Sequence, residues 1–514
     1  MLLFSPVLSL LALSVVGQQF TNPVLWEDLA DTDVIRVNDT YYLTSSTMHY
    51  SPGAPILRSY DLVNWEYISH AVPRLDWGSK YDLTGGQRAY VEGIWASTFN
   101  YRKSSRTYYW LGCIRGSNTQ IYTAPAAEGP WSRKGTISNC YYDAGLLVDP
   151  DTDIMYVAYG NTQLSVAQLS SDGLSQARTQ NVFNSPSNIG TLEGSRFYKR
   201  NGNYYIFVTK PANGQYVLKA SSPWGPYTSK QLLFNIQTPI AGGGIPHQGG
   251  LVETQNGVWY YMAFVDSYPG GRIPVLAPIT WDSDGFPVIQ TVNGGWGASY
   301  PYPLPKRVLE SPVGTDTFNS TSLSHHWEWN HNPEISKFSV GAGLKLETVT
   351  VTNDLYVARN TVSRRILGPA STATIVLDYS GMKQGDRAGL ALLRDQSAWI
   401  GIKNDSGTFR VIMVNGVAMN SNWSTRSTGS EVSATTVTGG KIWLRASADI
   451  RPGSGRQGRF SYSTDGKTFT TFGNALVMNN DWHFFMGYRF AVFNYATTSL
   501  GGEVIVEEFT LTAA

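Results

Sequence analysis

The sequence of 514 residues is short of charge: Asp, Glu, Lys and Arg make up only 15% of it, where about 25% is typical. Its 39 Lys and Arg nearly balance its 38 Asp and Glu, and the formal net charge is +1. The chain therefore lacks the excess of positive charge on which binding to nucleic acid or to an acidic membrane surface depends. We expect neither partner.

Long hydrophobic runs are also missing. Beyond the N-terminus, no stretch approaches the ~20 apolar residues that a membrane-spanning helix needs. The apolar run at residues 2–16 is too short to span a bilayer and ends in small residues, which is typical of a secretion signal cleaved after Gly17. We therefore expect residues 1–17 to be a signal peptide and the mature chain to be secreted and extracellular.

Cysteine is scarce, since Cys113 and Cys140 are the only two. Neither has a Cys or His beside it, so the pair makes a poor zinc site, and in an oxidising compartment a disulfide is the expected state. Sequons for N-glycosylation fit the same compartment. They begin at Asn38, Asn319, Asn404 and Asn422.

Helical periodicity is essentially absent, whereas aromatic residues (13%) and glycine (51 residues) are abundant. Five segments share one form, in which a short strand and a polar turn precede a strand that opens on adjacent aromatic residues. The aromatic marks of these segments are Tyr41, Tyr108, Tyr156, Tyr204 and Tyr260. Turns such as Asn201-Gly202 are typical of β-hairpins, because Asn and Gly tolerate positive φ.

Repeated antiparallel units of this kind, arranged radially, form a β-propeller. We predict five blades within residues 18–300; a large sandwich with coincidental hairpins is the alternative. After a proline-rich connector that begins at Pro301, the paired aromatics stop and short alternating strands take over. Residues 301–514 are therefore predicted to be a linker and a β-sandwich, and the fold class is all-β.

In a propeller the inner strands begin near the axis, so equivalent positions in the repeats converge there. A similar distance before each aromatic mark lie Asp31, Trp95, Asp143, Glu193 and His247. Two carboxylates beside a glycosidic bond provide the acid and the base for its hydrolysis, and a third can tune their pKa values. The alternative for each acid is a structural hydrogen bond to loop amides.

These residues lie in segments that resemble glycoside hydrolase family 43, such as LEGSRFYKRNGNYYIF at 192–207. The other segments of the resemblance are 29–65, 93–111, 247–266 and 270–287. Residues 316–333 and 379–390 resemble the concanavalin-like sandwich (a jelly roll) of many β-xylosidases and arabinofuranosidases in that family. The resemblance thus implies the same two domains as the repeats.

The resemblance implies hydrolysis with inversion, with Asp31 as general base, Glu193 as general acid and Asp143 as the residue that tunes their pKa values. Both aspartates depart from the family pattern, because Thr32 and Ala144 stand where a proline is usual. It implies no cofactor for the chemistry.

Three further positions carry implied roles. Trp95 corresponds to an apolar wall of the sugar pocket, or is a plain core residue; Arg272 corresponds to a contact with substrate hydroxyls, or lies on the surface. His247 corresponds to an axial histidine that in relatives faces water or calcium. A structural calcium near His247 requires further oxygen ligands, because calcium takes ~6–8; a hydrogen-bonded histidine without metal is the alternative.

The substrate expected from the resemblance is arabinoxylan or its oligosaccharides, from which α-L-arabinofuranosyl groups are removed. A β-xylosidase or a bifunctional enzyme is the alternative, and a non-catalytic carbohydrate-binding protein is a third. A fructan-acting relative of family 32 is disfavoured, because neither its Asn-Asp-Pro-Asn nor its Arg-Asp-Pro stretch occurs. We expect a monomer, in which the sandwich either binds polymer or serves as a packing partner.

Overall fold

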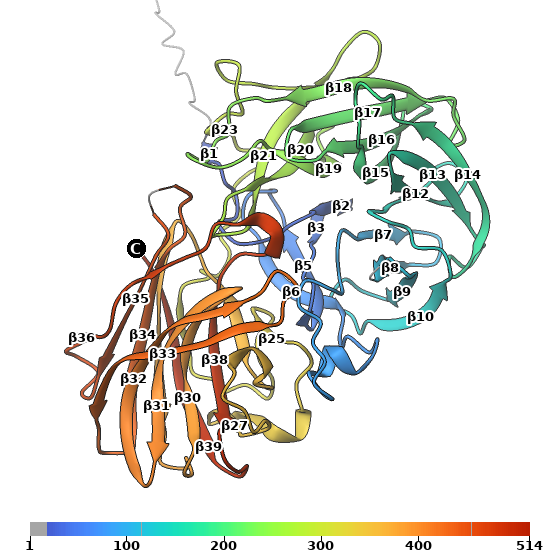
Figure 1. The fold of residues 1–514 in the computed structure, drawn as a ribbon. Helices are drawn as coiled ribbons and strands as arrows, with labels where there is room; N and C mark the ends of the chain where they lie inside the picture. The colour runs from blue at the N-terminus through green and yellow to red at the C-terminus, as the bar shows by residue number, and fades with distance from the viewer. Residues whose placement is uncertain (1–17, 115, 454) are drawn as a thin grey trace, which may run out of the picture.

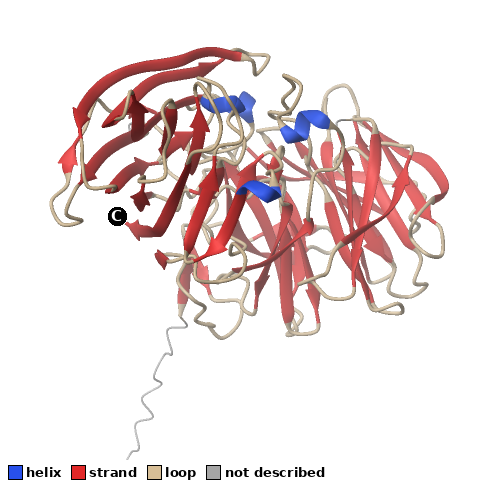
Figure 2. Cartoon of the chain, turned by 90° about the horizontal axis from the view of Figure 1, so that it is seen from below, coloured by secondary structure: helices blue, strands red, loops and turns tan. Residues whose placement is uncertain are grey.

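The computed structural model describes residues 18–114, 116–453 and 455–514, so the predicted signal peptide at 1–17 lies outside the described residues. The chain folds into a ring of β-sheets with a two-layered β domain beside it (Figure 1). Helix is confined to a few short 3₁₀ turns in the described part of the chain (Figure 2). They are η1 (Ser79–Asp82), η2 (Ile335–Lys337), η3 (Leu355–Val357) and η4 (Trp482–Phe484). None of the helices described is long and apolar enough to cross a membrane.

The ring consists of five four-stranded antiparallel sheets, which confirms the predicted five-bladed propeller. Blade one contains β2 (Asp33–Val37), β3 (Thr40–Thr44), β5 (Gly53–Ser59) and β6 (Glu66–Val72). Blade two contains β7 (Thr98–Arg102), β8 (Thr107–Ile114), β9 (Asn118–Ala124) and β10 (Ser132–Ile137). Blade three contains β11 (Gly145–Val148), β12 (Met155–Asn161), β13 (Gln163–Leu169) and β14 (Gln176–Asn184). Blade four contains β15 (Glu193–Arg200), β16 (Asn203–Lys210), β17 (Gly214–Ala220) and β18 (Thr228–Phe234). Blade five contains β19 (His247–Glu253), β20 (Trp259–Asp266), β21 (Arg272–Trp281) and β22 (Pro287–Ile289).

The five aromatic marks have one structural role. Each lies in the second strand of its blade and is at least 93% buried, with exposures of 0–7%. The polar turn before the mark joins the two innermost strands, and Asn38 and Asn201 occupy positive φ there, at 56° and 47°. Burial of these rings between blades is the hydrophobic contribution that makes each hairpin part of the ring.

The N-terminal segment is attached to blade five and to the strand that follows it. β1 (Gln19–Thr21) pairs with β23 (Ser299–Pro301), and the amide of Asn22 donates to the carbonyls of Leu276 and Gly297 at 2.9 Å each. The five inner strands β2, β7, β11, β15 and β19 lie against one another around the axis, so the residues at their starts meet at one end of it.

The second domain is a sandwich of two antiparallel sheets over one apolar core. One sheet contains β24 (Gly314–Asp316), β26 (Phe338–Gly341), β27 (Gly343–Glu347), β29 (Ala370–Asp378), β34 (Lys441–Asp449), β35 (Gln457–Ser463), β36 (Thr470–Thr471), β37 (Leu476–Val477) and β39 (Glu503–Ala513). The other contains β25 (Trp327–Asn330), β28 (Val362–Arg365), β30 (Asp386–Leu393), β31 (Gln396–Asp405), β32 (Thr408–Met419), β33 (Thr425–Thr436) and β38 (Arg489–Ala496).

The two domains share a sheet. β4 (Tyr50–Ser51), from the loop between β3 and β5 of blade one, pairs with β25 of the sandwich. Tyr90 of the propeller packs in the same apolar cluster as Phe484 and Met486 of the sandwich. The sandwich therefore holds the loops of blades one and two, on which part of the site described below is built.

A buried ion cluster also joins the domains. Glu328 of β25 is fully buried and accepts from Arg489 at 2.6 Å and from Arg365 at 2.9 Å. His70 of blade one lies 3.1 Å from the same carboxylate, and Arg365 also donates to the carbonyl of Asp28 at 2.8 Å. With these partners the buried charge is compensated.

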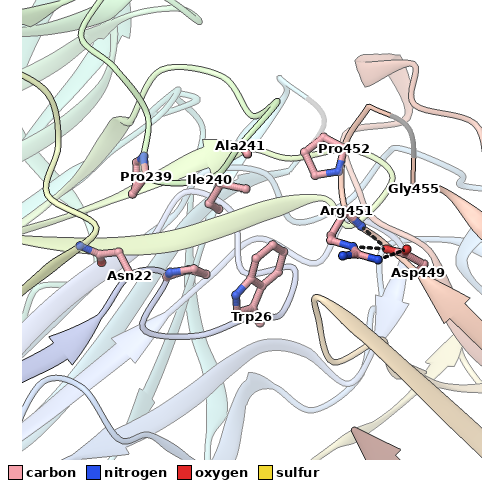
Figure 3. A pocket seen from close by; sticks show the side chains of 10 residues that line it. Asn22, Trp26, Pro239, Ile240, Ala241, Asp449, Arg451, Pro452 and Gly455 are labelled. Atoms are coloured by element: carbon pink, nitrogen blue, oxygen red, sulfur yellow. Dashed lines mark hydrogen bonds and ion pairs between the residues drawn. The ribbon is translucent and has the colours of Figure 1, made fainter. Parts of the chain in front are cut away.

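A separate groove of about 470 Å³ runs between the domains (Figure 3). Trp26 and Ile240 line it from the propeller side, and Arg451, paired with Asp449 at 2.5 Å, lines it from the sandwich. None of the carboxylates predicted to act in hydrolysis lines this groove.

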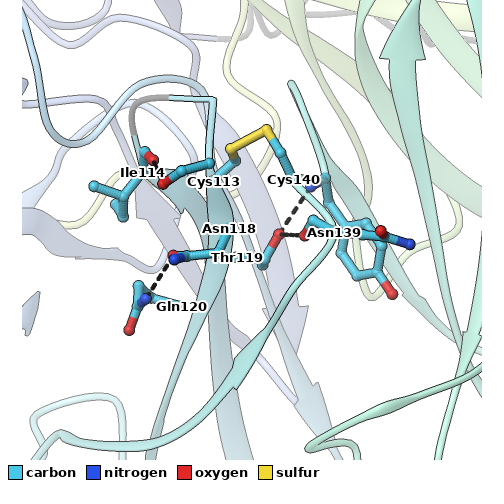
Figure 4. The surroundings of a disulfide bond; sticks show 9 residues. Cys113, Ile114, Asn118, Thr119, Gln120, Asn139 and Cys140 are labelled. Carbon is cyan, nitrogen blue, oxygen red and sulfur yellow. Dashed lines mark hydrogen bonds between the residues drawn. A yellow bond between two sulfur atoms is a disulfide. The ribbon is translucent and has the colours of Figure 1, made fainter.

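The disulfide expected between Cys113 and Cys140 is present (Figure 4). It ties the end of β8 to the segment that leads into Tyr142 and Asp143. Thr119 reinforces this link, because its hydroxyl donates to the carbonyl of Asn139 and accepts from the Tyr141 N–H, both at 2.8 Å.

Among the four sequons, Asn404 is a poor acceptor for glycan. Its side chain is only 5% exposed and donates to the carbonyl of Met382. Asn38, Asn319 and Asn422 are exposed. A sequon is a local pattern that does not reveal on which face of a strand the Asn lies.

Candidate active site

A small pocket of about 100 Å³ lies where the inner strands begin. The three predicted carboxylates, Asp31, Asp143 and Glu193, all line it, and so do Trp95 and Arg272. The remaining lining residues are Met48, Ala96, Tyr142, Gln248 and Phe485. The topology thus brings residues from all five blades, and one from the sandwich, to a single cavity.

The backbone presents two of the carboxylates from an unusual conformation. Asp31 and Asp143 each lie two residues before an inner strand and have φ of 56° and 50°. Non-glycine residues seldom occupy this left-handed region, and such conformations persist where surrounding contacts hold them. The repeat therefore supplies a tight turn at equivalent places, and each turn directs a carboxylate to the pocket.

Asp31 is almost completely buried and has two polar partners. The hydroxyl of Ser46 donates to Oδ2 at 2.5 Å, and Nη1 of Arg272 lies 3.3 Å from Oδ1. These two contacts hold the carboxylate in place at the pocket wall.

Glu193, the first residue of β15, accepts hydrogen bonds from the hydroxyl of Tyr142, at 3.3 Å, and from the amide of Asn161. Its pKa is raised, chiefly by burial and further by the charge of Asp31. The two hydrogen bonds and Arg272 act in the opposite direction, because they favour the ionised form. A raised pKa suits a carboxylic acid that must hold a proton near neutral pH.

Asp143 is the second carboxylate of the pocket with a raised pKa. Burial, followed by the charges of Glu193 and Asp31, raises the pKa of Asp143 well above its ordinary value, although Arg196 and Arg272 lower it. The negative charges of Glu193 and Asp31 thus disfavour ionisation of Asp143 in this small cavity.

Arg272, the first residue of β21, is held from several sides. Nε lies 3.2 Å from Asp266, and the guanidinium carbon lies 5.0 Å from the ring centroids of both Phe264 and Phe485. These contacts leave the side chain 13% exposed. Arg272 is thus a component of the pocket wall beside Asp31.

Trp95 forms another wall. Its indole N–H donates to the carbonyl of Val91 at 2.9 Å, which fixes the ring, and the rings of Trp95 and Tyr142 form a T-shaped pair with centroids 6.5 Å apart. Part of the ring packs on the interdomain cluster. Trp95 therefore lines the pocket and also packs against buried residues between the domains.

His247 does not line the pocket; the next residue, Gln248, does. Nδ1 of His247 lies 2.7 Å from the carbonyl of Ile245, Nε2 lies 3.8 Å from Asp266, and burial lowers the pKa of the ring. Within the described ranges, no three His, Cys, Asp or Glu side chains are grouped to hold a metal ion. The donor set at His247 does not fit calcium, so the calcium hypothesis has no support here.

Several residues of the site were not predicted from the sequence, among them Met48 and Gln248 of the pocket lining. Tyr142 directly precedes Asp143, and this adjacency was the only signal for it. Asn161 is the last residue of β12, the second strand of its blade. The residues predicted from the repeats lie near the starts of the inner strands, one strand closer to the axis. Phe485 belongs to the sandwich, and nothing in the propeller repeats points to it.

Comparison with known proteins agrees with this architecture. A family model described as glycosyl hydrolases family 43 matches residues 20–287, and one described as the β-xylosidase C-terminal concanavalin A-like domain matches residues 315–512. This chain is 47% identical in sequence to a solved GH43 glycoside hydrolase. That structure comes from work in which engineering of the active site generated an enzyme with both endo-xylanase and exo-arabinofuranosidase activity. That match has a TM-score of 0.93 and covers 97% of this chain and 100% of the other.

Two curated relatives are more distant. The β-xylosidase of Formosa agariphila is 27% identical, over 96% of this chain and 90% of that protein. A non-reducing end α-L-arabinofuranosidase of Bacteroides ovatus is 28% identical, over 74% and 75%. Because the family model spans more than half of the chain, this protein belongs to glycosyl hydrolase family 43 and carries the concanavalin-like C-terminal domain found in β-xylosidases of that family.

Proposed function

We propose that the protein is a secreted, inverting glycoside hydrolase that removes terminal α-L-arabinofuranosyl groups from arabinoxylan or its oligosaccharides. The observation that carries this proposal is the convergence of Asp31, Asp143 and Glu193 on one small pocket. Such a pocket favours a single terminal sugar over a continuous chain. The solved relative at 47% identity, whose engineered form has exo-arabinofuranosidase activity, supports the choice of sugar.

In the proposed mechanism, Glu193 protonates the glycosidic oxygen as the bond to the leaving group breaks. Asp31 accepts a proton from the water that attacks the anomeric carbon from the opposite face. Asp143 influences the proton affinity of Glu193 through its charge, and Arg272 holds Asp31 and contacts substrate hydroxyls. No cofactor takes part in these steps.

A β-xylosidase is the second candidate, because the Formosa agariphila relative bears that name and matches nearly the whole chain. Both candidates use the same three carboxylates on neutral pentosides. The shape of the pocket rim decides between them, and a comparison of rates on aryl α-L-arabinofuranoside and aryl β-D-xyloside distinguishes them directly.

The proposed roles are tested by Glu193→Gln and Asp31→Asn. Each substitution keeps the side-chain size, so we expect unchanged thermal unfolding together with a loss of kcat of roughly 10²–10⁴-fold, the usual contribution of a general acid or base. Asp143→Asn should reduce kcat less. Near-normal hydrolysis by Glu193→Gln, or wild-type protein that binds arabinoxylan without cleaving it, would contradict the proposal.

A further inference from the structure

A fully buried arginine lies against the main chain that carries the pocket carboxylates. Arg196 is on β15, three residues after Glu193, and its side chain is 1% exposed. It does not line the pocket, so it is not placed to touch a substrate. Burial of an arginine is unfavourable unless its donors are satisfied, which makes its partners informative.

The guanidinium of Arg196 donates to main-chain carbonyls next to all three carboxylates. Nη2 donates to the carbonyl of Asp31 at 2.6 Å, and Nη1 donates to those of Ala144 and Ser195 at 2.8 Å each. Nε has a longer contact of 3.4 Å with the carbonyl of Thr32. These carbonyls belong to blades one, three and four. They are those of Asp31 itself, of Ala144, which follows Asp143, and of Ser195, two residues after Glu193.

The counter-ion extends the same network to blade two. Oδ1 of Asp33 lies 3.5 Å from Nε of Arg196, and Oδ2 accepts from the Thr98 hydroxyl at 2.7 Å and from the Phe99 N–H at 3.1 Å. The Thr98 oxygen in turn accepts from the Leu146 N–H at 2.8 Å. One arginine–aspartate pair thus joins the inner strands of four blades.

The hydrogen bonds of Arg196 lie beside the two residues with left-handed backbone conformation. Asp31 and Asp143 have left-handed φ, and such residues need neighbouring contacts to keep that conformation. Arg196 binds the carbonyl of Asp31 itself and that of Ala144, which follows Asp143, while the Ser195 N–H donates to the Asp143 carbonyl at 2.9 Å. The packing is close, because a Cβ on Gly145 would lie 2.6 Å from Cα of Arg196.

We propose that Arg196, with Asp33 as its counter-ion, is a positioning residue that fixes the spacing of Asp31, Asp143 and Glu193 by binding the main chain beside each of them. This inference rests on the proposed function, because it assigns Arg196 a part in the same reaction. The planar guanidinium suits this role, since it presents five N–H donors in a fixed fork. A lysine would keep the charge but not the geometry.

The test compares Arg196→Lys with the wild type on an aryl α-L-arabinofuranoside and on an aryl β-D-xyloside, with kcat and KM measured separately. Displacement of reacting groups by about 1 Å can reduce turnover on the order of 100-fold, and we expect a loss of kcat of that size with KM little changed. The matched control is Arg364→Lys. Arg364 is a buried arginine of the sandwich that also donates to a carbonyl, that of Pro312 at 2.6 Å; its variant should keep both constants.

Asp33→Asn is the second variant, because it removes the negative charge that faces Arg196 and leaves the guanidinium present. It tests the inference if Arg196→Lys does not fold. We expect a smaller loss of kcat, again with KM little changed and with a cooperative unfolding transition. The inference is wrong if the folded variants keep wild-type kcat while Glu193→Gln is inactive. If instead the wild type hydrolyses neither glycoside, or Glu193→Gln is as active as the wild type, the proposed function itself fails.

Discussion

The ring of Phe485, from the sandwich, lies 5.0 Å from the guanidinium carbon of Arg272, from blade five, at the wall of the pocket. The main chain around both residues is held by one side chain. Asp28 accepts from the Arg272 N–H at 2.8 Å and from the Gly487 N–H at 2.9 Å. The sandwich is therefore part of the site rather than only a neighbour of the propeller.

We predict that Phe485→Ala raises KM by about tenfold on arabinoxylan oligosaccharides, because it removes an apolar wall and loosens Arg272. A cation–π contact in a partly desolvated site contributes about 1–2 kcal/mol, which corresponds to this factor. Steady-state kinetics measures the effect.

Phe469→Ala is the control for Phe485→Ala. The ring of Phe469 lies 3.4 Å from the guanidinium carbon of Arg445 on the sandwich, but neither residue lines the pocket. Equal changes in the two variants would show that the effect comes from the stability of the sandwich and not from the pocket wall.

The pH dependence should respond to Tyr142→Phe. The hydroxyl of Tyr142 lowers the pKa of Glu193 by favouring its ionised form, so the loss of that hydroxyl raises this pKa. The protonated acid then persists to higher pH, and the basic limb of kcat/KM moves upward. Asn161→Ala should shift the limb in the same direction, because Asn161 also favours the ionised form.

Tyr159→Phe serves as the control for this shift. The Tyr159 hydroxyl is paired with that of Thr179 at 2.8 Å, and Tyr159 does not line the pocket. Its pH profile should match that of the wild type. A basic limb that stays in place or moves downward in Tyr142→Phe would contradict the assignment of Glu193 as the acid.

Stability should depend on the interdomain carboxylate of Glu328. Burial alone would raise its pKa, but Arg365 and Arg489 reverse this and hold the pKa well below the ordinary value of 4.5. A depressed folded-state pKa stabilises the protein fully above the unfolded-state value and progressively less as pH falls below it. Acid unfolding should therefore begin below about pH 4.5.

Glu328→Gln leaves the two arginines without a buried counter-charge and should lower the free energy of unfolding by about 3–5 kcal/mol at neutral pH. Denaturant unfolding measures this loss. Glu347→Gln removes a partly exposed ion pair with Lys337 at 2.9 Å and should change stability by less than about 1 kcal/mol. Equal effects of the two substitutions would contradict the importance of the buried cluster.

The disulfide should contribute to stability near the pocket. Cys113 and Cys140 are 27 residues apart, and closing a loop of that length stabilises by about 3–4 kcal/mol in the chain-entropy model. We predict that the Cys113→Ala, Cys140→Ala double variant unfolds at lower denaturant concentration and that its kcat is also reduced, since the bond anchors the segment before Asp143. Unchanged unfolding on reduction would contradict this.

The propeller and its carboxylates were accessible from the sequence because the blades are built from local hairpins. Tyr41 and Tyr204, with their preceding turns, mark equivalent strands of two blades. Because the inner strands surround one axis, residues at equivalent positions of the repeats lie close together there. The place of Phe485 in the pocket wall and the pairing of β4 with β25 were not accessible, because both depend on contacts between distant parts of the chain. Arg196 could not be predicted for a related reason: it binds main-chain carbonyls of three blades, and a pattern of side chains in the sequence does not show such contacts.

His247 shows the limit of reasoning by equivalence. The repeat places it level with the carboxylates, but Gln248 faces the pocket in its place, with φ of 40°. A shift of one residue at a tight turn changes which side chain points inward, and the sequence spacing does not resolve it.

The central claim is that the chain releases arabinofuranose with inversion through Glu193 and Asp31. Proton NMR of the products formed from arabinoxylan oligosaccharides and from xylobiose, followed from the first turnovers, tests it most directly. We predict arabinose released with the anomeric configuration opposite to that of the substrate, and no release by Glu193→Gln. Release with retained configuration would contradict the mechanism, and xylose as the sole product would contradict the proposed specificity.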